Sequence, residues 1–169
     1  MKTINIKDIK EITLLSKEEA GQLDRGKLRR KNDDWCDWWL RTPCNDFIHH
    51  TYVVGSNGGV FYDSVFFTRW VRPALRINEL QSYNLKEEEE VECLGKTWIA
   101  IGVDDLILMK DFLFSHRFDA TSNDYEKSEI KQVINDWLVA RKVEAIMKEY
   151  NANSPEELEQ RLIEFGAVE

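Results

Sequence analysis

The chain has 169 residues, 43% of them hydrophobic, and a formal net charge of −8 at neutral pH. This length fits one domain, or one domain with a helical extension. Six Trp, five Tyr and eight Phe are enough for a packed core, which excludes a wholly disordered chain. Apolar runs stay far below the ~20 residues of a membrane helix, and no secretion signal begins the chain. We therefore expect a cytoplasmic protein with no membrane partner.

Charge is distributed unevenly. Residues 1–31 carry nine Lys or Arg against five Asp or Glu, so the remaining residues carry −12. The five Lys or Arg residues between Arg25 and Lys31 carry enough positive charge to bind phosphates. However, the aromatic or glycine pattern of a known nucleic-acid-binding module is missing. We favour a solvated loop and expect no nucleic-acid partner. The acidic run Glu87–Glu90 with Glu92 lacks the spacing of a calcium loop and is typical of a solvated linker or the exposed start of a strand.

In chain order, the first predicted element is a helix beginning after Ser16, because Ser16 and Glu19 have capping-box spacing. Gly21 or Gly26 can end it. The tryptophan-rich segment 35–43 predicts a short strand closed by Pro43. For Trp38 and Trp39 we favour core packing over a platform for stacking sugars or bases.

Residues 51–77 predict β structure. Tyr52–Val54 is a strand and Gly55–Gly59 a turn. Val60–Tyr62 and Val65–Phe67 are expected to pair as a hairpin across Asp63 and Ser64. Residues 71–77 alternate like a further strand, with Pro73 at an edge or a bulge.

The last third predicts a second hairpin and then helices. Residues 97–103 and 106–109 are expected to pair across Asp104 and Asp105. Apolar residues at helical spacing predict a helix from Ile130 to about Tyr150, broken by residues 151–153. Ser154 then caps a second helix whose predicted apolar face is Leu158, Leu162 and Phe165. The sum is an α+β fold, with a core over residues 1–120 and a helical segment over 121–169.

Few residues of the sequence are candidates for catalysis or metal binding. The common nucleophile, zinc and phosphate-binding motifs are missing. His49 and His50 would point to opposite faces of a strand, so they cannot chelate one ion as a pair. Cys36, Cys44 and Cys93 form no CxxC pair and are expected to be reduced. For Cys36 and Cys44, buried inert thiols are favoured over a redox or copper pair. No metal and no cofactor are expected.

Two motifs carry a family resemblance. Trp38–Pro43 (WWLRTP) and Val71–Leu75 (VRPAL) resemble the hallmarks WWLR[ST]PG and GVRPAL of an uncharacterised domain family of Gram-positive gut bacteria and their phages. Residues 14–20 and 125–138 resemble two further elements of that family. The resemblance covers roughly residues 13–138. The family looks like a distant relative of the formylglycine-generating, sulfatase-modifying-factor type of C-type-lectin-like fold, which implies an irregular antiparallel sheet, short helices and a helical C-terminus.

The chain departs from the family pattern at three places. Cys44 replaces the glycine after Pro43, and Trp70 replaces the glycine before Val71. The module around 96–138 follows the motifs instead of preceding them, so the chain looks circularly permuted. The copper-binding cysteine pair of the enzyme branch has no counterpart within 45–77, so the resemblance implies no oxidase.

In lectin-like relatives that bind ligands, the variable stretch before the closing motif presents the binding surface, and here that stretch is 45–70. Exposed aromatic side chains with arginine are typical of an interaction hot spot. The opposing interpretation is that Phe61, Val65 and Phe67 simply fill the core. The candidate binding residues are Asn45, Asp46, His49, His50, Asn57, Tyr62, Asp63, Phe66, Phe67, Arg69 and Trp70.

Three hypotheses on function follow. The favoured one is a non-enzymatic binding module that recognises a protein or a small ligand through the 45–70 surface. The alternative is an acidic inhibitor from a phage or mobile element that occupies the cationic groove of a host nucleic-acid-handling enzyme. The third is a thiol- or metal-dependent enzyme using Cys44 with His49 or His50. The sequence predicts no oligomeric state.

Overall fold

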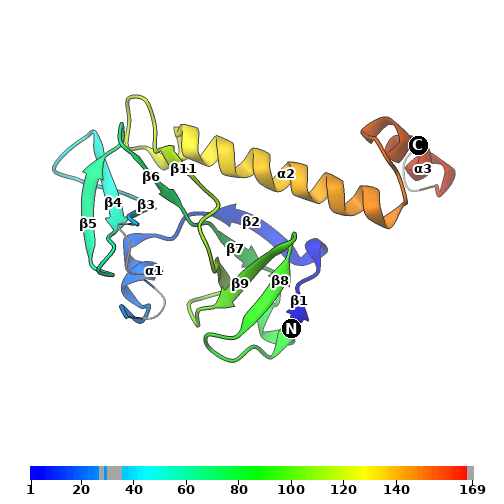
Figure 1. Cartoon of the computed structure of the whole chain (residues 1–169), viewed down its shortest axis with the longest axis horizontal. Coiled ribbons are helices and arrows are strands. Elements are labelled where there is room, and N and C mark those ends of the chain that lie inside the picture. Colours follow the sequence, from blue (N-terminus) through cyan, green and yellow to red (C-terminus); the bar gives the residue numbers. More distant parts are fainter. Residues whose placement is uncertain (27–28, 30–35, 167–169) are drawn as a thin grey trace. The chain divides into compact units, whose positions relative to one another are not determined.

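The computed structural model describes residues 1–26, 29 and 36–166, so most of the predicted basic loop and Trp35 lie outside the described residues. The chain divides into two compact units, residues 1–134 and 135–169. The first unit holds all the strands of the described chain together with the short helix α1 (Figure 1). The long helix α2 begins in the first unit and continues into the second, which ends with the short helix α3.

The fold is α+β, with two mixed sheets of which one curls into a half-barrel. In the described chain the strand order is β1-β8-β9-β10-β7-β2 in one sheet and β11-β6-β3-β4-β5 in the other. The expectation of antiparallel pairing alone is wrong, because β1 runs parallel to β8 and β3 runs parallel to β6. The elements are β1 (Lys2–Thr3), the 3₁₀ helix η1 (Ile6–Asp8), β2 (Ile9–Thr13), α1 (Lys17–Gly21), β3 (Trp38–Pro43), β4 (His50–Val54), β5 (Val60–Ser64), β6 (Thr68–Val71), β7 (Ala74–Ile77), η2 (Leu80–Tyr83), β8 (Glu90–Cys93), β9 (Lys96–Ala100), β10 (Leu106–Met109), β11 (Phe114–Arg117), η3 (Tyr125–Lys127), α2 (Glu129–Glu149) and α3 (Pro155–Glu164).

The predicted capping box is confirmed at α1. The Ser16 hydroxyl accepts a hydrogen bond from the Glu19 backbone N–H at 3.0 Å, and the Glu19 carboxylate accepts one from the Ser16 N–H at 2.8 Å. These bonds satisfy backbone donors that the first helical turn leaves unpaired. The helix ends at Gly21.

The tryptophan-rich strand is also confirmed. β3 ends at Pro43, and Trp38 and Trp39 are fully buried, as the core interpretation predicts. Because adjacent strand residues face opposite sides, the two rings pack on opposite faces of the sheet. Trp38 joins the cluster of Leu40 and Val54, whereas Trp39 meets the ring of Phe118 edge-on at 5.6 Å.

The predicted pairing of residues 60–67 is wrong. β5 continues through Asp63 and Ser64 and pairs with β4 across the glycine turn, so residues 65–67 form the next turn instead of a second strand. The prediction failed because Asp and Ser are common in turns but also fit the more polar face of an edge strand.

The predicted strand over 71–77 is likewise two strands. β6 ends at Val71 and belongs to one sheet, whereas β7 begins at Ala74 and belongs to the other. Pro73, which has no N–H to donate, lies in the connection between the sheets instead of at an edge or a bulge. The motif VRPAL is therefore the point where the chain changes sheet.

The later elements follow the predictions closely. β9 and β10 pair antiparallel as expected. α3 begins at Pro155 with Ser154 as its cap. The predicted apolar face of α3 is not buried at Phe165. This residue is 69% exposed, and its ring centroid lies 5.6 Å from that of Tyr150. Neither helix of this region, nor any other in the described chain, combines the length and apolar character that spanning a bilayer requires.

Candidate functional site

Exposed apolar side chains are concentrated in one stretch of the first unit. Of the eleven large hydrophobic residues exposed in the described chain, seven lie between residues 47 and 70. Scattered single exposed apolar residues are ordinary, but a local concentration indicates an interaction surface. The seven are Phe47, Ile48, Phe61, Tyr62, Phe66, Phe67 and Trp70.

The register of β4 and β5 places the candidate residues on two faces. Tyr62 pairs with Tyr52, and Asp63 pairs with Thr51. Because consecutive strand residues point to opposite sides, Tyr62 and Asp63 cannot share a face. The eleven candidates therefore do not form one site.

One group is an aromatic face, which we define as Phe47, His50, Tyr52 and Tyr62. The Phe47 ring centroid lies 5.2 Å from that of His50 and 5.5 Å from that of Tyr62. Tyr62 also meets His50 at 5.8 Å and Tyr52 at 6.2 Å, both edge-on. Lys17 Nζ lies 4.3 Å from the centre of the Tyr52 ring. Phe47 and Tyr62 are each 47% exposed, so the cluster is preassembled and still accessible.

The loop between β3 and β4 is held in place by residues outside it. Asn123 Nδ2 lies 3.2, 3.3 and 2.9 Å from the carbonyl oxygens of Cys44, Phe47 and His50. His49 Nδ1 hydrogen-bonds to the Thr121 carbonyl at 2.8 Å. Sequence reasoning missed Asn123, because its partners are backbone carbonyls more than 70 positions away and no sequence motif indicates such a contact.

A second group lies on the opposite face of the same sheet. Arg69 Nε and Nη2 both approach Asp63 Oδ2, at 2.7 and 2.6 Å, and Arg69 Nε is 3.9 Å from Asp37 Oδ2. Charge on Arg69 is thus already balanced by two carboxylates. A hollow of about 440 Å³ lies beside this ion pair, lined by Asp37, Thr68, Arg69, Trp70 and Ser115.

The remaining candidates have other surroundings. The Trp70 ring stacks on Phe112 at 5.2 Å, with 13° between their planes. The Phe66 and His49 rings lie 5.6 Å apart, with their planes tilted by 36°. Asn57 belongs to the glycine turn, where its side chain accepts from the Gly59 N–H and its carbonyl from Arg25 Nε. Asn45 and Asp46 are exposed.

The core interpretation holds for only one of its three residues. Val65 is fully buried, but Phe61 is 43% and Phe67 51% exposed. The Phe61 ring lies against Gly55, where an added Cβ would fall 2.3 Å from Phe61 Cε1. The Phe67 ring is 5.2 Å from Arg69 Cζ.

The motif residues, in contrast, are structural. The Arg72 guanidinium is buried over the Trp38 ring and donates to the Met109 carbonyl at 2.7 Å. Burial lowers the pKa of Arg72 to about 10, against the opposing effect of Asp111, so it remains charged at neutral pH. Arg41 donates to both oxygens of Glu19, at 2.6 and 3.1 Å.

Among the described residues, cysteine and histidine side chains do not gather into a metal-binding group. In the described part of the chain the structure shows no group of three His, Cys, Asp or Glu placed to hold an ion. Cys36 is half-buried, Cys44 and Cys93 are buried, and none of the three is in a disulfide. The Cys44 backbone N–H donates to the His50 carbonyl, which is a structural contact.

Residues 4–79 match the family model of a domain of unknown function, DUF6273. The matched segment contains α1 and the motifs WWLRTP and VRPAL, on which the family resemblance rests. An uncharacterised domain is therefore confirmed over this part of the chain. The chain has no significant match among curated proteins, and none among solved structures. The whole aromatic face lies within the DUF6273 segment.

Proposed function

We propose that this protein is a non-enzymatic binding module whose partner is another protein, contacted through the aromatic face. The observation that carries the proposal is the contact of Phe47 with Tyr62, two rings that are each nearly half exposed. Aromatic residues that are ordered before binding lose little conformational entropy when a partner covers them. Such residues supply most of the binding energy in many protein interfaces.

The surroundings of the face support a protein partner over a small ligand. Phe47 and Tyr62 are each 47% exposed, and neither ring lines the pocket beside η2, the hollow beside Asn123 or the hollow beside Arg69. Small ligands are usually held in concave sites that bury most of their surface. An exposed aromatic cluster with Lys17 against the Tyr52 ring instead fits a complementary surface on another protein.

The lectin-like relationship belongs to the same proposal. It is supported by the packing of the two motifs, because Trp38 of the first pairs in register with Trp70, next to the second. In that relationship the 45–70 stretch is the ligand-binding segment, and it carries the aromatic face here. The circular permutation remains a prediction from the order of the motifs.

The test is partner capture with matched variants. The tagged protein is incubated with nuclease-treated lysate of the organism that encodes it, at low and high salt, and bound proteins are identified by mass spectrometry. A partner that the wild type and Ile163→Ala capture, but Phe47→Ala/Tyr62→Ala does not, supports the aromatic face. Ile163 is a suitable control because it is 50% exposed and lies in the other unit. Circular dichroism checks that the double variant is folded.

The outcomes separate the proposal from its alternative. A partner retained by Phe47→Ala/Tyr62→Ala but lost at high salt would favour the acidic inhibitor and contradict the aromatic face, since screening weakens charge-driven association. A partner held at high salt and lost in the double variant supports an apolar contact.

A further inference from the structure

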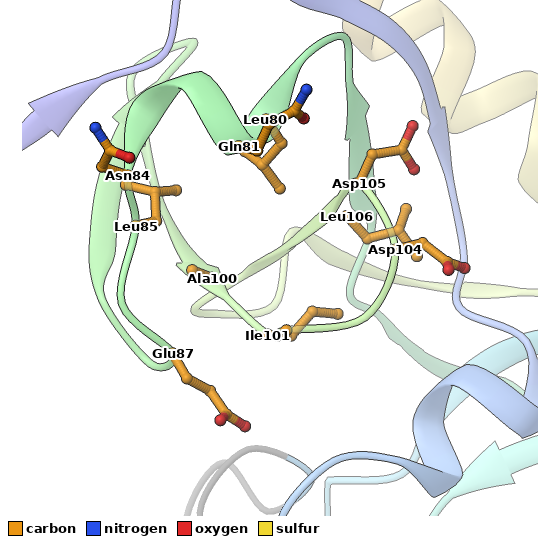
Figure 2. A pocket seen from close by; sticks show the side chains of 11 residues that line it. Leu80, Gln81, Asn84, Leu85, Glu87, Ala100, Ile101, Asp104, Asp105 and Leu106 are labelled. Atoms are coloured by element: carbon orange, nitrogen blue, oxygen red, sulfur yellow. The ribbon is translucent and has the colours of Figure 1, made fainter.

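A second candidate binding site lies in the other sheet, far along the sequence from the aromatic face. It is a pocket of about 500 Å³ formed by η2 with the loop after it and by the loop between β9 and β10 (Figure 2). This volume is within the range of sites that hold small molecules. The pocket is also outside the segment matched by DUF6273, which ends at residue 79.

The pocket has apolar walls. Leu80 and Leu85 come from the η2 side, and Ile101 and Leu106 come from the β9–β10 side. Ile101 and Leu106 are buried in the protein core, so this wall is fixed by packing. Leu80 and Leu85 are half-buried and leave apolar surface for a ligand to cover.

The polar residues of the pocket are acidic or neutral. Its lining contains Glu87, Asp104 and Asp105 but no lysine or arginine. Asp105 is already paired, since Arg76 Nη1 lies 2.7 Å from its Oδ1. Glu87 and Asp104 are exposed, and Figure 2 shows them at separate sides of the pocket. The pocket therefore attracts positive charge at two places and also offers the apolar surface of Leu80 and Leu85.

Hydrogen bonds with residues outside the two loops hold the pocket in this shape. Lys2 Nζ donates to the carbonyls of Tyr83 and Asn84 at 3.0 and 3.1 Å. The Tyr83 hydroxyl donates to Asp8 at 2.5 Å. On the other side, the Ile77 N–H donates to the Asp105 carbonyl at 2.8 Å. Both loops are thus tied to the sheet, and a ligand would not have to order them.

We propose that this pocket binds small organic dications, with an ammonium group near each of Glu87 and Asp104 and an aliphatic chain over the partly exposed side chains of Leu80 and Leu85. A divalent metal ion fits less well, because it needs several oxygen ligands converging on one point. The described residues place no group of three metal-ligating side chains here or elsewhere. The chemical class is that of α,ω-diamines and polyamines.

The probe is 1,6-diaminohexane, titrated by calorimetry and by NMR of the labelled full chain at constant ionic strength. Its comparators are 1-aminohexane, with one charge, and 1,6-hexanediol, with none. We expect the diamine to bind about threefold more tightly than the monoamine, which is what one exposed ion pair provides. The diol should not bind measurably. Shifted resonances should include those of Leu85, Gly102 and Asp104.

Three variants complete the test. Glu87→Gln and Asp104→Asn should each weaken diamine binding about threefold, to the level of the monoamine. Asp104 has a φ of 46°, a conformation that Asn adopts readily, so this variant keeps the loop. Glu18→Gln, an exposed carboxylate on α1, is the matched control and should leave binding unchanged.

Several results would overturn the proposal. They are a diamine that binds no more tightly than the monoamine, an equal loss in Glu18→Gln, or displacement of the diamine by Mg²⁺ at matched ionic strength. Each would mean that the chain attracts cations only through its overall charge. None of them bears on the aromatic face, which is tested with different residues and a different readout.

Discussion

The Arg72 guanidinium lies over the indole ring of Trp38, with its Cζ 5.0 Å from the ring centroid, and both side chains are buried. Trp38 comes from the motif WWLRTP and Arg72 from VRPAL, so the two hallmark segments pack directly on one another. A buried arginine is tolerated when its N–H groups are satisfied and its charge faces an aromatic ring. The residues by which the family resemblance is recognised therefore stabilise the fold, and the proposed binding surface is made of other residues.

Replacing Arg72 should destabilise the first unit. Arg72→Ala removes the hydrogen bond to the Met109 carbonyl, the contact with Trp38 and the packing of the side-chain stem. We expect the free energy of unfolding to fall by about 3 kcal/mol. Arg72→Lys keeps the charge but not the planar fork, and should cost about 1–2 kcal/mol. Urea denaturation followed by tryptophan fluorescence measures both values.

The control for Arg72 is Arg117→Ala. Arg117 pairs with Glu129 at 2.9 Å, but its side chain is 46% exposed, so its loss should leave the free energy of unfolding almost unchanged. Equal effects of the two alanine variants would contradict a structural role for Arg72.

Glu19 should make stability depend on pH. Burial by itself would raise the pKa of this carboxyl, but the hydrogen bonds from Arg41 and from the Ser16 N–H, with the positive charges of Arg41 and Arg76, outweigh burial and lower it. Because the folded pKa is below the unfolded one, the carboxylate contributes stability above the unfolded pKa of about 4.3, and this contribution is lost as pH falls through the folded pKa. Glu19→Gln should therefore be less stable than the wild type at pH 7, by about 2 kcal/mol.

The measurement is urea denaturation of the wild type and Glu19→Gln from pH 7 to pH 3. The difference between the two proteins should shrink steadily below about pH 4.5. Glu18→Gln, one position earlier and exposed, controls for general effects of charge. A difference that stays constant down to pH 3 would disprove the proposed ionic contribution.

Gly55 should be required for the position of the Phe61 ring. A Cβ at residue 55 would lie 2.3 Å from Phe61 Cε1, so Gly55→Ala forces the ring to move. We expect a loss of about 1–2 kcal/mol. Gly21→Ala is the matched control, because nothing lies within 4 Å of its added Cβ and alanine favours the helix.

A double-mutant cycle tests the cause. In a Phe61→Ala background the ring is gone, so Gly55→Ala should cost less there than in the wild type by at least about 0.5 kcal/mol. Additive losses would show that the Gly55→Ala defect comes from the backbone of the turn instead.

Asn123 should order the loop that carries Phe47. Asn123→Ala removes the donor group to three loop carbonyls. We expect amide hydrogen exchange in residues 44–50 to become about tenfold faster, with a loss of global stability of about 1 kcal/mol. Ser122→Ala, one position earlier, is the control and should leave exchange in the loop unchanged. A loop that exchanges at the wild-type rate in Asn123→Ala would mean that its own bonds suffice.

The sequence by itself determined the elements whose causes are local. The capping box at Ser16, the cap and proline that begin α3, and the helical spacing of α2 all act within a few residues, so each was predicted correctly. Burial of Trp38 and Trp39 was also predictable, because two such large rings in one short strand can be removed from water only inside the core.

Only the tertiary structure decided how the strands pair and which side chains meet. The parallel pairing of β3 with β6 and the change of sheet at Pro73 depend on contacts between segments far apart in the chain, which no local pattern encodes. The same reason explains the candidate site. The stretch 45–70 was predicted as a surface, but its division into two faces follows from the pairing of Tyr62 with Tyr52, and the order of its loop follows from the distant Asn123. Strand register is a collective property of the sheet, because a shift of one residue would turn every side chain to the other face.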